Sequence, residues 1–194
     1  MKRIFIFTGM FFLIFGLTFA QESFYKKLAD SAEVLTTQKV IYDPSYFTID
    51  YPNGDVPADR GVCTDVVIRA YRKVGVDLQK LVHEDMLENF AKYPNNWGLS
   101  RPDKNIDHRR VPNLMTYFDR HNAALQISSH SKNYKPGDIV SWDLGNGMTH
   151  IGIVSKYMSK NETPLIIHNI GKGQVLEDIL FAYKIIGHYR FKTE

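Results

Sequence analysis

The pattern of apolar residues changes near Ala123, and this change limits the folds open to the chain. Before that point, apolar residues recur every three or four positions, as on one face of a helix. After it, short runs are β-branched or alternate apolar with polar residues, as in strands. Helices followed by strands predict an α+β domain in which helices pack against one face of an antiparallel sheet.

The two halves also predict individual elements. Helices are expected over residues 22–38, from Cys63 to a stop signal at Gly75, over 77–93, and from Pro112 onward. Strands are expected over residues 125–128, 139–142, 150–155, 165–170 and 184–191. The irregular segment 42–60, rich in proline and glycine, is of a length often associated with function.

The first twenty residues have the pattern of a secretory signal peptide. Lys2 and Arg3 are basic, residues 4–19 are almost continuously apolar, and Ala20 completes a small-residue cleavage site. We therefore expect a signal peptide over 1–20 and a single domain over 21–194, monomeric and periplasmic or secreted, without stable membrane association after cleavage. The alternative is an uncleaved N-terminal anchor.

The charge pattern argues against a nucleic-acid partner. The whole chain has a formal net charge of +3, and loss of the signal peptide removes two positive charges. The remainder has neither a lysine-rich tail nor aromatic residues interleaved with basic ones. We expect no nucleic-acid binding.

Cys63 is the chain's single cysteine, and it stands where a loop is expected to become a helix. One cysteine cannot close an internal disulfide in an exported protein, so the thiol stays free. Backbone N–H groups and the helix dipole stabilise a thiolate at a helix start and lower the pKa of the thiol. We expect an exposed nucleophile in the first turn; the alternative is a small buried apolar side chain.

His150 and His168 are placed to complete a nucleophilic site with Cys63. Each lies in one of two consecutive expected strands, and neighbouring antiparallel strands can bring two side chains together on one face. We expect His150 to be the base and His168 to fix its orientation and tautomer. Asn169 or a nearby carboxylate is the alternative orienting group.

Three sequence blocks resemble those of NlpC-type papain-like cysteine hydrolases, which cleave amide bonds in bacterial cell-wall peptides. That family has a helix-initiating cysteine, a Gly-Asp strand that leads to a His-apolar-Gly-apolar strand, and a strand ending in apolar-apolar-His. The corresponding residues here are Cys63-Thr64-Asp65, then Gly137-Asp138-Ile139-Val140 with His150-Ile151-Gly152-Ile153, and then Ile166-Ile167-His168-Asn169. With the runs 57–65 and 108–114, the chain resembles an uncharacterised bacterial branch of that superfamily.

The resemblance implies a papain-like fold and an exported hydrolase with a Cys-His-His triad. It also implies that Tyr51, about a dozen residues before the cysteine, helps to hold the oxyanion, with Tyr42 and Tyr46 as less well placed alternatives. The substrate would be an amide bond of peptidoglycan, either between muramic acid and the stem peptide or within the stem. The expected partner is therefore a stem peptide or a related amide.

The residues beside the cysteine depart from the family pattern. Many relatives have Asp before and Ser after it, a pair that binds the free amine of a stem peptide, whereas this chain has Val62 and Thr64. Asp65 or Asp59 could contact an amine instead, but helix capping explains those two residues equally well.

Two other function classes fit the same residues. A non-catalytic envelope module would bind wall peptides without turnover, and a thiol acyltransferase would pass the acyl group to an amine or lipid. Zinc binding by the cysteine and the two histidines is disfavoured, since the chain has neither HExxH nor paired cysteines. We therefore expect no metal and no cofactor.

For a few residues, the sequence is compatible with either a structural or a functional role. The run His108-Arg109-Arg110 suggests a solvated loop, or alternatively a site for the carboxylates of an acidic peptide. Trp97 and Trp142 suit core packing or a groove lining. The other four histidines, at positions 83, 121, 130 and 188, lie in contexts that indicate surface or structural roles.

Overall fold

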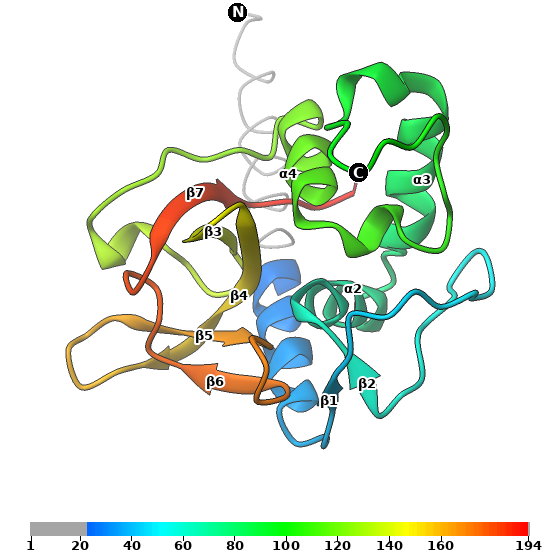
Figure 1. The fold of residues 1–194 in the computed structure, drawn as a ribbon. Coiled ribbons are helices and arrows are strands. Elements are labelled where there is room, and N and C mark those ends of the chain that lie inside the picture. The colour runs from blue at the N-terminus through cyan, green and yellow to red at the C-terminus, as the bar shows by residue number, and fades with distance from the viewer. Residues whose placement is uncertain (1–22, 194) are drawn as a thin grey trace, which may run out of the picture.

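The computed structural model describes residues 23–193, and its centre is a five-stranded antiparallel sheet with the strand order β6-β5-β4-β3-β7 (Figure 1). The strands are β3 (Ile139–Gly145), β4 (Met148–Met158), β5 (Pro164–His168), β6 (Val175–Glu177) and β7 (Lys184–Tyr189). The α+β architecture expected from the sequence is confirmed.

The helices precede the sheet in the chain, as the periodicity predicts. Residues 23–35 are helical, and they are followed by α2 (Cys63–Lys73), α3 (Leu78–Asn89) and α4 (Val111–Arg120). Short 3-10 turns lie at η1 (Phe90–Lys92), η2 (Asp107–Arg109) and η3 (Ser131–Asn133). Gly75 follows α2 with a φ of 85°, the left-handed conformation that favours glycine after a helix.

A two-residue parallel pair fixes the chain just before α2. Strand β1 (Ile41–Tyr42) lies beside β2 (Arg60–Gly61), with Tyr42 opposite Gly61. The backbone N–H of Asp43 extends this pairing by donating to the Gly61 carbonyl at 3.2 Å. Both ends of the irregular segment 42–60 are therefore held next to the start of α2.

Both faces of the sheet are buried. On one face, isoleucines of β3, β4 and β5 pack with the helix of residues 23–35, α2 and α4; the sheet residues are Ile139, Ile151, Ile153 and Ile167. On the other, Trp142 and Val154 join a smaller cluster with Tyr134 and Leu180, which lie in loops. The helices thus cover one face, as expected, and loops cover the other.

Besides the short pair β1 and β2, which was not expected, the strand predictions differ from the structure at two places in the second half of the chain. The segment 125–128 is not a strand: apart from one bridge between Ala124 and Tyr189, it is irregular. The hydroxyl of Tyr134 donates to the carbonyl of Ser128 and accepts from its N–H, which holds this segment as a loop. Strand β6, three residues long, was not expected at all, because so short a run has no readable alternation.

Within residues 23–193, no helix is both long and apolar enough to cross a membrane. The expected signal peptide over 1–20 and its cleavage site lie outside the described residues.

Candidate active site

Cys63 is the first residue of α2, and the helix start holds it against the sheet. Val62 precedes it as the N-cap, and the Asp65 carboxylate accepts a hydrogen bond from the Val62 N–H at 2.7 Å. A valine side chain cannot accept a bond itself, so only this reciprocal half of a capping box is present. The site cysteine therefore begins the helix, as the sequence predicts.

The thiol is buried, in contrast to the expectation of an exposed first turn. Cys63 is 7% exposed, and burial raises the pKa of its thiol to about 12. The amide of Ile151 lies close enough to hydrogen-bond the sulfur and opposes this shift, as do the amides of Thr64 and Cys63. The helix start does supply stabilising N–H groups, but in the free protein the loss of water outweighs them.

The Ile151 amide lies beyond the pairing of β4 with β5. This pairing runs from Met158–Pro164 to Ile153–Ile167, and β5 ends at His168. The start of α2 therefore lies near the end of this pairing, beside the residue that follows His150.

The structure brings His150 and His168 together. Nε2 of His150 on β4 lies 3.0 Å from Nδ1 of His168 on β5, and the rings are nearly perpendicular, with an interplanar angle of 82°. Since His168 occupies Nε2, the nitrogen of His150 left for a thiol is Nδ1. The alternative orienting group, Asn169, faces elsewhere: its side-chain N–H donates to the Gly61 carbonyl at 3.1 Å.

Both rings are buried and favour their neutral forms. Burial, reinforced by the nearby His168, lowers the pKa of His150 to about 3. Burial likewise lowers the pKa of His168, although Glu177 opposes the shift. The two rings and the Cys63 thiol therefore all favour their neutral forms.

Glu177 is a site neighbour that sequence reasoning missed. Its Oε2 lies 3.1 Å from Nε2 of His168, and its Oε1 lies 3.5 Å from Nζ of Lys172. It belongs to β6, the strand that was not expected, so no sequence signal pointed to it.

The contacts of Tyr51 do not support its expected place beside the cysteine. Its hydroxyl donates to Glu84 at 3.5 Å, and its ring packs edge-on against His83, with ring centroids 5.3 Å apart. Both partners lie on α3. Tyr51 lies at the sequence distance from Cys63 that the resemblance implies, but the loop between the two residues brings Tyr51 to α3.

Tyr42, one of the two alternatives, is held close to the start of α2. Pairing of β1 with β2 sets Tyr42 opposite Gly61, two residues before Cys63. Burial raises the pKa of Tyr42, and negative charge on Cys63 and Asp65 would raise it further. Tyr46, the other alternative, donates instead to Asp103 at 3.0 Å.

The histidine–arginine run is not a solvated loop. His108 and Arg109 are buried, and Arg109 is bound to the carboxylate of Asp65. Asp65 is therefore committed to the protein and is not free to hold a substrate amine. Arg110 lies over the ring of Trp97, 4.0 Å from its centroid. Trp142 is fully buried, with its ring centroid 5.7 Å from that of His150.

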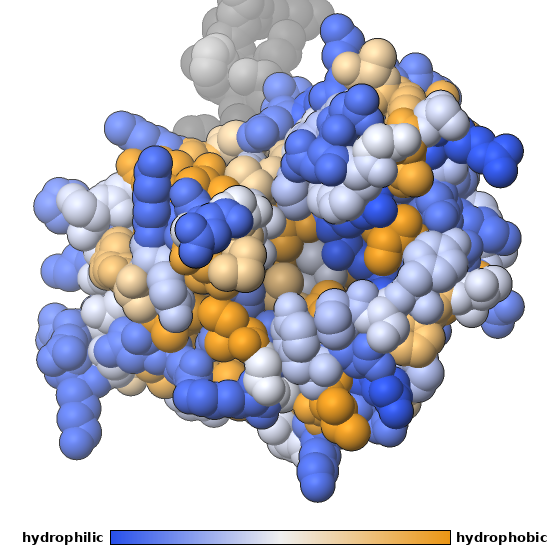
Figure 2. All heavy atoms as spheres, in the orientation of Figure 1, coloured by the Kyte–Doolittle hydropathy of each residue, from blue (hydrophilic) through white to orange (hydrophobic). Residues whose placement is uncertain are grey.

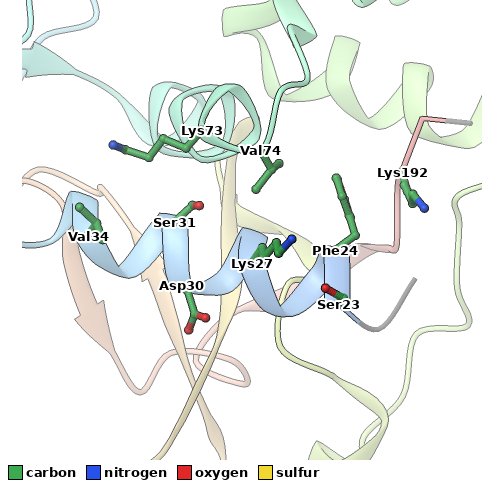
Figure 3. A pocket seen from close by; sticks show the side chains of 9 residues that line it. All are labelled: Ser23, Phe24, Lys27, Asp30, Ser31, Val34, Lys73, Val74 and Lys192. Carbon is green, nitrogen blue, oxygen red and sulfur yellow. The ribbon is translucent and has the colours of Figure 1, made fainter. Parts of the chain in front are cut away.

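The surface is hollowed between the sheet and the helices in the view of Figure 2, over β4 and α2, the elements that carry His150 and Cys63. A separate cavity of about 840 Å³ lies between the helix of residues 23–35 and the end of α2 (Figure 3). Its lining includes Lys27, Lys73 and Lys192 but none of the site residues. Among residues 23–193, no group of three or more histidine, cysteine or acidic side chains is placed to hold a metal ion.

Comparisons with known proteins identify a matching family, a similar relative and a solved structure of similar fold. The family whose model matches residues 29–191 is described as a domain of unknown function, DUF1287. A protein of Escherichia coli (strain K12), "Uncharacterized protein YijF", is 56% identical over 164 residues, which are 84% of this chain and 80% of that protein. The crystal structure of an N-acetylmuramoyl-L-alanine amidase from Bacteroides uniformis superposes with a TM-score of 0.51 at 14% identity, covering 88% of this chain and all of the other. That likeness concerns the fold.

Proposed function

The chain belongs to the DUF1287 family, and from the site that it carries we propose that it is an exported cysteine hydrolase that cleaves an amide bond in bacterial peptidoglycan. The observation that carries the proposal is the pair of buried rings, with Nε2 of His150 3.0 Å from Nδ1 of His168, beside the Cys63 thiol that contacts the next residue of β4. A nucleophile, a base and a group that orients the base are what covalent amide hydrolysis needs.

We assign the fold to the papain-like class of the NlpC type. The three sequence blocks that resemble this family fall on α2, on β3 with β4, and on β5, in the order that the family requires. The similarity of the fold to that of an N-acetylmuramoyl-L-alanine amidase supports a cell-wall hydrolase.

In the proposed mechanism, Nδ1 of His150 takes the proton of Cys63 as Sγ attacks the amide carbonyl carbon. The oxyanion accepts hydrogen bonds from the Cys63 N–H and the Tyr42 hydroxyl. His150 then gives its proton to the leaving nitrogen, the C–N bond breaks, and a thioester remains. Water, deprotonated by His150, hydrolyses the thioester to a carboxylic acid and restores the thiol.

The thiol and the His150 ring are both neutral in the free protein. With the thiol pKa at about 12 and the His150 pKa at about 3, transfer of the proton before attack is unfavourable, so in this mechanism the proton moves only as Sγ attacks. His150 therefore acts as a general base toward a thiol, rather than as the partner of a preformed thiolate.

The surroundings of the cysteine favour the bond between muramic acid and the stem peptide. Cleavage next to a free N-terminal amine would need an acidic group for that amine, but Asp65 is bound to Arg109 and to the Val62 N–H. Val62 replaces the aspartate that many relatives use. An amide with no nearby amine, such as muramoyl-L-alanine, is the better fit.

Digestion of purified sacculi, with the released fragments identified by mass spectrometry, tests the proposal. The mature chain should release fragments that carry a new carboxyl and a new amine. Cys63→Ala and His150→Gln should abolish release, since loss of a triad nucleophile costs on the order of 10⁶ in kcat. His121→Gln, at an exposed histidine of the helical half, is the matched control and should stay active.

Two results would reject the proposal. Fragment release by Cys63→Ala at the wild-type rate would exclude the thiol mechanism. Sacculus binding without release, unaffected by Cys63→Ser, would point to the non-catalytic module, for which the high thiol pKa is the supporting observation. The place of action, periplasmic or secreted, is checked by fractionating cells that express the full chain.

A further inference from the structure

A chain of hydrogen-bonding groups runs from the proposed base to a carboxylate on the edge strand of the sheet. His150 Nε2 lies 3.0 Å from His168 Nδ1, and His168 Nε2 lies 3.1 Å from Glu177 Oε2. The pairing of His168 with Val175 and of Ile166 with Glu177 sets Glu177 diagonally across from His168 on neighbouring strands. Such diagonal pairs lie within reach of long side chains.

The carboxylate determines where the protons of this chain reside. An ionised carboxylate can only accept, so Nε2 of His168 must carry the hydrogen. In a neutral ring the other nitrogen, Nδ1, is then an acceptor, and Nε2 of His150 must donate to it. Nδ1 of His150 is left with a free lone pair.

Without the carboxylate, the contact between the two rings would be compatible with either tautomer of each ring. His168 could instead carry its hydrogen on Nδ1 and donate to His150 Nε2. The same two atoms would then form a hydrogen bond with donor and acceptor exchanged. Nδ1 of His150 would then carry a hydrogen and could not take the proton of a thiol. The direction of the bond between the rings therefore decides whether His150 can be a base.

We propose that Glu177 is a positioning residue that sets the tautomer of His150 through His168 and so leaves Nδ1 of His150 unprotonated toward Cys63. The order of protons follows from this geometry for an ionised carboxylate and neutral rings, and only its importance for catalysis rests on the proposed function.

The surroundings of His168 support a single, fixed proton order. The ring is fully buried, so it stays neutral and carries one hydrogen. The groups facing it are His150 from β4, Glu177 from β6, and Lys172 from the loop between β5 and β6, which contacts the other oxygen of Glu177. Glu177 is thus held at both oxygens, one facing His168 Nε2 and the other facing Lys172 Nζ.

Long-range ¹H–¹⁵N correlation spectra of the ¹⁵N-labelled mature chain test the proposal directly, since they distinguish the two imidazole tautomers. In the wild type, His150 and His168 should both carry hydrogen on Nε2. Glu177→Ala should give a measurable Nδ1–H population on both rings. Asp178→Asn, the same loss of charge at the exposed neighbouring position, should leave the wild-type pattern.

The wild-type spectrum alone can overturn the proposal, even where Glu177→Ala does not fold: an Nδ1–H tautomer at His150 contradicts it. An unchanged pattern in a folded Glu177→Ala protein contradicts it equally.

Alkylation of Cys63 by iodoacetamide, followed by intact mass, adds a kinetic measure that needs no substrate. A wrong tautomer of the catalytic histidine costs on the order of 10⁴ in a serine triad, so we expect Glu177→Ala to slow alkylation by at least ~10-fold. Asp178→Asn should react at the wild-type rate. Equal rates for Glu177→Ala and wild type would overturn the proposed effect on the base. Intact sacculi after digestion by the wild type would instead reject the peptidoglycan substrate and leave the proton order standing.

Discussion

Arg109 and Asp65 form an ion pair inside the protein. Nε of Arg109 donates to Oδ1 of Asp65 at 3.0 Å and Nη2 donates to Oδ2 at 3.1 Å, and the side chains are only 2% and 3% exposed. The same carboxylate caps α2 through the Val62 N–H, and the same guanidinium donates to the Ser45 carbonyl at 3.0 Å. This pair therefore joins the start of the cysteine helix to the segment that carries Tyr42.

Removal of the arginine should be costly because it leaves a buried, unpaired carboxylate. We expect Arg109→Met to lower the free energy of unfolding by about 3–5 kcal/mol. Urea unfolding followed by tryptophan fluorescence measures the change. Arg110→Met is the matched control, since its guanidinium stacks on the partly exposed Trp97, and it should cost about 1 kcal/mol. Equal losses for the two variants would contradict the role of the buried pair.

Tyr42 and Tyr51 give a direct comparison of two candidates for the oxyanion site. Because Tyr42 pairs with Gly61, two residues before Cys63, we assign it as the oxyanion donor and expect Tyr42→Phe to lower kcat on sacculi by about 10²–10³, the usual effect of one lost donor. Tyr51→Phe removes only a contact to Glu84 on α3 and should leave kcat near wild type. Initial rates of fragment release measure both. A larger loss of kcat in Tyr51→Phe than in Tyr42→Phe would indicate that Tyr51, and not Tyr42, is the oxyanion donor.

The residues that were predicted from the sequence share one property: their positions follow from local patterns. Cys63 begins a helix that its own periodicity predicts, and His150 and His168 lie in alternating runs that become neighbouring strands. Antiparallel pairing of consecutive strands then brings the two rings together without further information.

The residues that were missed or misplaced depend on long-range packing. Tyr42 reaches the site through a two-residue pairing with Gly61, and Glu177 through a three-residue edge strand, and neither element has a readable period. The expectation of an exposed Cys63 was wrong and the buried alternative holds, because the start of α2 packs against β4.

The pH dependence of turnover should reflect the buried base. His150 must be unprotonated to accept the thiol proton, and its pKa is lowered to about 3, so activity is lost only as the pH falls toward that value. We expect a level kcat/KM between about pH 5 and pH 9, in contrast to the loss near pH 6.5 that an unshifted histidine would give. Rates on sacculi across this range measure it, with circular dichroism at each pH to confirm folding. A loss of kcat/KM on the acid side, centred near pH 6.5, would contradict this prediction, because it would show that the pKa of His150 is not lowered.

His108 should link stability to pH without taking part in the site chemistry. It is 2% exposed, its Nδ1 has no hydrogen-bond partner, and burial lowers its pKa from 6.5 to about 3. The unfolded chain therefore binds a proton that the folded chain does not, over the range between these two values. Stability is full above the unfolded pKa and falls as the pH decreases, by about 1.4 kcal/mol per pH unit for each such histidine.

His108→Gln removes one of these groups, so the slope of unfolding free energy against pH should decrease by about 1.4 kcal/mol per unit between about pH 6 and pH 4. Urea unfolding at several pH values in this range gives the slope, which does not depend on any constant loss of stability that the substitution causes. His130→Gln, at an exposed position, is the control and should retain the wild-type slope. An unchanged slope in His108→Gln would mean that His108 takes up its proton in the folded protein as readily as in the unfolded chain.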